Sequence, residues 1–125
     1  MAGALTISTL NDSSGVLATQ NGMTGIAKAW VNFDGTGGAT IRGSYNVSSV
    51  TYNGTGDYTV NFTTAMPNAN YSAVTSVGAF TNTDGTNRSI TERHHQTTSV
   101  RLMAYVSTTG SASDVPSANV AIFSS

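Results

Sequence analysis

The stretch that decides the fold reads Asp57-Tyr58-Thr59-Val60-Asn61-Phe62. Polar and apolar side chains alternate strictly along it, and successive residues of a β-strand point to opposite faces of a sheet. The pattern therefore predicts a half-buried strand whose inward face carries Tyr58, Val60 and Phe62. The dipeptides just before it, Asn53-Gly54 and Gly56-Asp57, are typical of the tight turn that joins two antiparallel strands.

The same alternation recurs along most of the chain. From Ile26 onward it places Ala29, Val31 and Phe33 on one face and Trp30 on the other, polar-phase face. No window shows helical periodicity over three turns, and turn signals return every 8–12 residues. Further strands are expected at 40–47, 71–80, 89–94 and 100–106 and around 120–122. The sequence thus predicts an all-β, antiparallel β-sandwich or jelly-roll-like domain over residues 26–125.

Residues 1–25 differ from this domain. Leu5, Ile7 and Leu10 are spaced apolar residues, and the run from Asn11 to Gly15 is typical of a turn. The segment has too few apolar residues to form a core of its own. We therefore expect an extended N-terminal arm that docks on its own domain, on a neighbouring subunit or on another protein.

Composition excludes several classes of function. Only 9% of the residues are charged, against about 25% in typical globular domains. Five basic and six acidic residues, without a basic cluster, predict no nucleic-acid partner. No stretch approaches the ~18 apolar residues of a membrane span, so no membrane partner is expected. The chain has no cysteine, which excludes disulfides and thiolate metal sites. A low-charge surface favours association with other proteins.

Residues that carry chemistry are few. His94 and His95 are adjacent, so in one strand they point to opposite faces; only an oligomer could gather copies of one of them around a metal. All the Asp residues lie in or beside expected turns, where Asp is favoured on backbone grounds. No Gly-x-Ser-x-Gly elbow and no carboxylate pair is visible. We predict no enzymatic activity, no catalytic residue, no cofactor and no metal.

Four phrases follow one another between residues 26 and 78. They are the runs Ile26–Gly38, Tyr45–Val50, Asn53–Phe62 and Met66–Tyr71. In this order they resemble a module found repeatedly in structural proteins of tailed bacteriophages, both in tail-fibre tips and in small stand-alone virion proteins. The resemblance implies a structural part of the virion, and no catalytic motif accompanies it. It also implies a homotrimer.

Two functions within the virion compete. The short chain and the arm favour a capsid decoration (cement) protein, which binds the major capsid protein on the outer surface of the phage head and stabilises the shell. Leu5, Ile7 and Leu10 are then the candidate capsid-anchoring residues, and Trp30 is the candidate subunit-interface residue. The alternative is a tail-fibre or head-fibre adhesin, which contacts tail proteins and a host surface glycan. A carbohydrate-binding module outside any virion is a third possibility.

Overall fold

The computed structural model describes residues 3–4, 6, 9–11, 16–18, 25–79 and 87–124. Every regular element among them is a β-strand, and no helix long and apolar enough to cross a membrane occurs there. The strands are β1 (Thr9–Asn11), β2 (Val16–Ala18), β3 (Ala29–Asp34), β4 (Thr40–Tyr45), β5 (Val47–Gly54), β6 (Asp57–Phe62), β7 (Ser72–Gly78), β8 (Arg88–Gln96), β9 (Ser99–Val106) and β10 (Ser117–Phe123).

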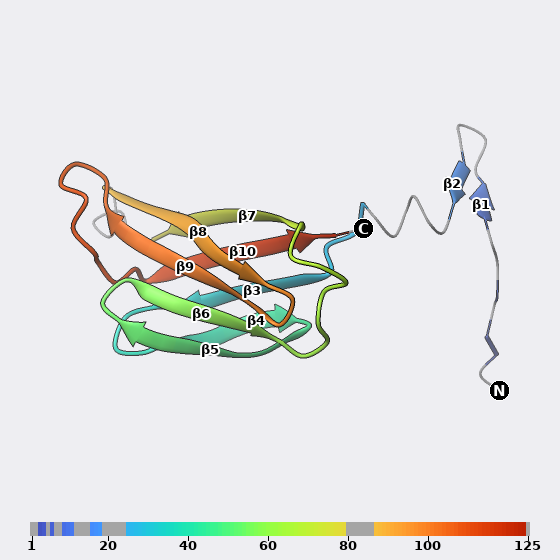
Figure 1. Ribbon diagram of the computed structural model, residues 1–125, viewed down its shortest axis with the longest axis horizontal. Helices are drawn as coiled ribbons and strands as arrows, with labels where there is room; N and C mark the ends of the chain where they lie inside the picture. Colours follow the sequence, from blue (N-terminus) through green and yellow to red (C-terminus); the bar gives the residue numbers. More distant parts are fainter. Residues whose placement is uncertain are drawn as a thin grey trace.

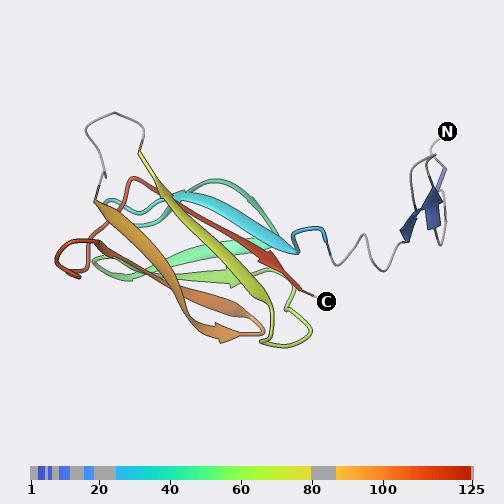
Figure 2. The same cartoon turned by 90° about the horizontal axis from the view of Figure 1, so that it is seen from above.

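Eight of these strands form two antiparallel sheets. The first sheet has the order β4-β3-β10-β7, and the second has the order β5-β6-β9-β8. Figures 1 and 2 show these strands gathered into one body, with the β1–β2 hairpin outside it. The prediction of an all-β antiparallel sandwich is confirmed.

The inner faces of the two sheets share one apolar core. Tyr58, Val60 and Phe62 of β6 are buried, as their alternation predicts, and so are Ala29, Val31 and Phe33 of β3. The rings of Phe33 and Tyr58 meet edge to face between the sheets, with centroids 5.0 Å apart. Large side chains from both sheets and from the connections between strands complete this core: Met66, Tyr71, Ile90, Val100, Leu102, Val115, Val120 and Ile122.

The strand expected at 40–47 is broken at Asn46. This residue has a φ of 54°, a left-handed conformation that Asn adopts more readily than most residues. The break ends β4 in the first sheet and starts β5 in the second, so the chain changes sheets within one residue. The Asn46 side chain secures the corner: its Nδ2 donates to the Lys28 carbonyl at 3.0 Å, and its Oδ1 accepts from the Thr64 amide at 2.7 Å.

A second difference from the sequence prediction concerns Tyr45. Strict alternation along the strand would place Tyr45 and Ile41 on the same face of the sheet. The register between β3 and β4 shifts at Asn32/Phe33: Phe33 pairs with Ile41, whereas Trp30 pairs with Tyr45. The extra residue in β4 reverses the phase of everything after it. Tyr45 therefore lies on the outer face beside Trp30, and the prediction that places it in phase with the core is wrong.

The N-terminal strands β1 and β2 pair with each other in a small antiparallel sheet, with Leu10 opposite Leu17. Leu5 and Ile7 of the predicted arm lie outside the described residues. So does Phe80, the last residue of the strand expected at 71–80; the observed β7 ends at Gly78.

Candidate functional site

An exposed apolar row crosses the outer face of the first sheet. Tyr45, Trp30, Ala121 and Val74 are register partners on β4, β3, β10 and β7 in turn. Directly paired residues on neighbouring strands have Cβ atoms about 5 Å apart, so the four side chains form one continuous stripe. Tyr45, Trp30 and Val74 are 58%, 41% and 57% exposed. We call this set the outer row.

Trp30 is the centre of the outer row. Its neighbours Ala29 and Val31 point into the core, so the alternation of β3 directs the indole outward. The second sheet covers the opposite face of the first sheet and therefore cannot bury Trp30. The ring lies over Gly43 of β4, where an added Cβ would come 3.4 Å from the indole. Gly43 thus leaves room for the aromatic side chain to lie along the sheet.

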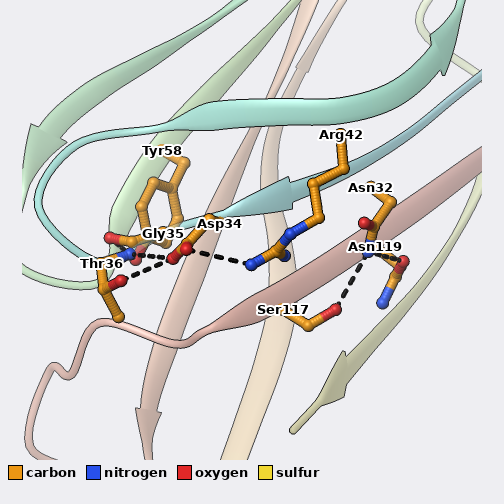
Figure 3. A network of polar contacts seen from close by, with 8 residues as sticks. All are labelled: Asn32, Asp34, Gly35, Thr36, Arg42, Tyr58, Ser117 and Asn119. Atoms are coloured by element: carbon orange, nitrogen blue, oxygen red, sulfur yellow. Dashed lines mark hydrogen bonds and ion pairs between the residues drawn. The ribbon is translucent and has the colours of Figure 1, made fainter. Parts of the chain in front are cut away.

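Beyond Trp30 the outer face becomes polar, as Figure 3 shows. The Asn32 amide donates to Ser117 Oγ at 3.0 Å and to Asn119 Oδ1 at 2.6 Å. At the end of β3, Asp34 accepts from the hydroxyl of Thr36 at 2.6 Å and from the guanidinium of Arg42 at 3.0 Å. These contacts, led by the Thr36 hydroxyl, hold the pKa of Asp34 below its usual value.

A groove adjoins the Tyr45 end of the outer row. It encloses about 480 Å³ and is lined by Lys28, Tyr45, Asn46 and residues 63–67. Asn46 organises it, since its side chain joins Lys28 at the start of the first sheet to Thr64 in the loop after β6. Lys28 is the only lysine of the chain and the only charged residue in the lining.

The outer face of the second sheet has a different character. Its polar side chains bond to one another: the Asn61 amide donates to Ser49 and to Thr51, each at 3.0 Å. Asp57 and Arg101 form a two-pronged ion pair, with Nε 2.8 Å from Oδ1 and Nη2 against Oδ2. The hydrogen bond from Arg101 is the main reason that the pKa of Asp57 is lowered. This face offers no apolar stripe.

Asp114 organises a partly buried turn cluster that sequence reasoning missed. Its Oδ1 accepts from the Gly56 amide at 2.7 Å and lies 3.1 Å from the Tyr58 hydroxyl, and its Oδ2 accepts from Tyr52 at 3.1 Å. The Tyr58 hydroxyl also lies 3.1 Å from the Gly35 carbonyl. Burial, and then the negative charge of Asp114, raises the pKa of Tyr58 well above its usual value. These partners are far apart in sequence, so no spacing could reveal them.

The two histidine side chains have different surroundings. His95 stacks flat on Tyr71, with ring centroids 4.6 Å apart, whereas His94 is exposed. A register shift between Glu92 and His95 sets this arrangement. Within the part of the chain that the structure describes, no three His, Cys, Asp or Glu side chains lie together as a metal site.

The other predicted site residues are only partly placed. Leu10 lies in β1, while Leu5 and Ile7 are outside the described residues. Sequence reasoning singled out Trp30, but it did not bring Tyr45 and Val74 to the same row, because their proximity depends on register across four strands. A comparison of the chain with protein-family models, with curated proteins and with solved structures found no match.

Proposed function

We propose that this chain is a structural protein of a bacteriophage virion, a homotrimeric decoration protein that binds the outer surface of the head shell. The observation that carries the proposal is the outer row, three large and well-exposed apolar side chains in register on a sheet face. Contiguous exposed apolar surface on a protein usually marks a contact with another protein. The resemblance of residues 26–78 to phage virion modules supplies the setting.

The outer row and the N-terminal arm have separate roles in this proposal. The outer row, centred on Trp30, lies between subunits of the trimer, and the arm with Leu5, Ile7 and Leu10 contacts the major capsid protein. Binding to the assembled lattice and not to free capsid subunits stabilises the lattice by mass action. Three arms on one trimer raise the affinity further, because the second and third arms bind as intramolecular events. No catalytic step, cofactor, nucleic acid or membrane takes part.

The test of the subunit interface uses a matched pair of charge insertions. Trp30→Arg places a cation in the outer row, and Thr51→Arg places one on the exposed outer face of the second sheet. Light scattering should give three times the 12.8 kDa chain mass for the unchanged chain and for Thr51→Arg. It should give a folded monomer for Trp30→Arg. An unchanged chain that is monomeric at micromolar concentration contradicts the proposal.

Trp30 also reports its own burial, because it is the only tryptophan of the chain. Its fluorescence should shift to shorter wavelength as the concentration rises through the assembly range. A spectrum that stays constant while the trimer forms would show that the interface lies elsewhere.

The groove favours the alternative function, an adhesin of a tail or head fibre. The lining combines Tyr45, whose ring offers a stacking surface, with Lys28, Thr63 and Thr64, which carry hydrogen-bonding groups, and this is the usual makeup of a small-ligand site. If the chain is an adhesin for a host glycan, Lys28→Ala should reduce adsorption of phage to cells. If it is a decoration protein, Lys28→Ala should leave adsorption unchanged.

A further inference from the structure

The four edge strands of the sandwich are not equally protected against pairing with another strand. The β4 edge carries Arg42 and a register shift, and the β8 edge carries Glu92 and Arg93 and a register shift. The β5 edge has two register shifts. Charges and bulges of this kind are how natural proteins prevent an edge from recruiting further strands.

The β7 edge has none of these features. Its sequence from Ser72 to Gly78 contains no charged residue and no proline, and all seven residues pair with β10 in unbroken register. No strand of described residues pairs with its other side. Thr75 lies on the inner face of β7, where its hydroxyl donates to the Ile90 carbonyl of β8, whereas Ser72, Val74 and Ser76 are exposed on the outer face. A smooth, uncharged edge of this length is a template for an added strand.

We infer that the β7 edge is covered by the N-terminal segment 3–8 of a neighbouring copy, added as a fifth antiparallel or parallel strand of the first sheet. This segment, Gly3-Ala4-Leu5-Thr6-Ile7-Ser8, is uncharged, and apolar and polar residues alternate along it from Leu5 to Ser8. Leu5 and Ile7 would then lie on the outer face next to Val74. The added strand would extend the outer row by one strand and would cover the exposed Val74 side chain.

In a closed ring of three, each copy gives one segment and receives one, so every β7 edge is covered once and the assembly stops growing. The inference rests on the proposed trimer. It narrows the capsid contact of that proposal: Leu5 and Ile7 pair with the neighbouring copy, and the β1–β2 hairpin, which carries Leu10, contacts the capsid.

Disulfide trapping tests the inference. Because the chain has no native cysteine, every disulfide must form between introduced cysteines. A tagged chain carrying Ile7→Cys is co-expressed with an untagged chain carrying Ser72→Cys, Val74→Cys or Ser76→Cys. These three positions share the outer side of β7 and scan the register. Strand neighbours have the Cα separation that a disulfide requires, about 4.4–6.8 Å. After mild oxidation, at least one pair should give a tagged–untagged dimer on a non-reducing gel.

Three further variants sharpen the result. Thr40→Cys on the charged β4 edge, combined with Ile7→Cys, should give no cross-link. Adding Ser76→Lys to a cross-linking pair that uses Ser72→Cys or Val74→Cys should abolish the cross-link, because it introduces a charge on the open edge. Thr40→Lys, the same change on β4, should leave the cross-link intact.

Several outcomes overturn the inference. Dimers formed by Ser76→Cys alone would mean that β7 pairs with β7. An intrachain disulfide in a chain that carries both Ile7→Cys and a β7 cysteine would place the segment on its own edge. Trapping of β7 on the capsid protein in intact particles would make that protein the occupant of the edge. A trimer seen by light scattering without any cross-link refutes the arm exchange and leaves the proposed function standing. A monomeric unchanged chain refutes the proposed trimer itself.

Discussion

At the scale of the residue, Phe62 illustrates how the core is held. It ends β6 on the inward face, and its ring meets Tyr71 edge to face with centroids 5.9 Å apart. The Tyr71 hydroxyl in turn lies 2.9 Å from the Ser99 carbonyl, so the polar end of this buried ring has a partner. The adjacent Asn61 points the other way, to Ser49 and Thr51 on the outer face.

Phe62→Ala should lower the free energy of unfolding by about 3–5 kcal/mol, from lost burial and from the cavity left against Tyr71. Asn61→Ala removes only exposed hydrogen bonds and should cost far less. Thermal or urea unfolding of the two variants measures the contrast. Equal losses would mean that the assigned inward face of β6 is wrong.

The Asp57–Arg101 ion pair predicts a pH dependence. Because the folded-state pKa of Asp57 is lowered, the unfolded chain binds a proton more readily in acid. The stabilisation by the pair is complete above the ordinary Asp value of about 4 and is lost as the pH falls through the lower folded value. Arg101→Gln should therefore lower stability at pH 7, and its stability should converge with that of the unchanged chain as the pH falls through the lowered folded value.

Arg42→Gln serves as the matched control for this titration. The lowered pKa of Asp34 comes mainly from the hydroxyl and amide of Thr36, so removing the Arg42 charge should change the acid dependence less. Unfolding free energies measured from pH 2 to pH 7 give both comparisons. A constant difference between Arg101→Gln and the unchanged chain over this range would contradict the assigned role of the pair.

At the scale of the element, the sequence predicts strands well where nothing interrupts the period of two. β3 and β6 have the inward faces that their alternation indicates. Prediction fails around β4 and β5 because one extra residue near Arg42 reverses the phase and one left-handed residue, Asn46, moves the chain to the other sheet. Neither the extra residue nor the left-handed residue changes the alternation of apolar residues enough to be recognised from the sequence.

The arm gives the prediction that belongs to this scale. Deleting residues 1–20 should leave the sandwich folded, because its core is built from β3 to β10 and the segments between them. Circular dichroism should keep the signature of the folded sandwich, while binding to expanded capsids in a sedimentation assay should be lost. A truncated protein that sediments with capsids at unchanged affinity would show that the arm anchors nothing.

At the scale of the whole molecule, the two outer faces are unlike. The second sheet presents polar groups that bond to one another, and the first presents an apolar row with a groove at one end. Trp30 could be predicted as part of a second apolar surface from its phase alone. The rest of the row could not, because it is assembled from strands whose residues lie as far apart in sequence as Trp30 and Ala121.

This asymmetry distinguishes reinforcement of a shell from adhesion to a cell. A decoration protein acts on the equilibrium of the capsid lattice, so particles without it should be fragile but should still attach to the host. An adhesin acts through its contact with the cell surface, so particles without it should be robust but should fail to attach.

The most direct measurement therefore compares phage with and without this protein for two properties, survival of heat or osmotic shock and adsorption to host cells. Decoration predicts a loss of survival with adsorption unchanged, and adding back the purified protein should restore survival. Particles that survive the shock as well as the unaltered phage but no longer adsorb would contradict the account and establish the fibre function.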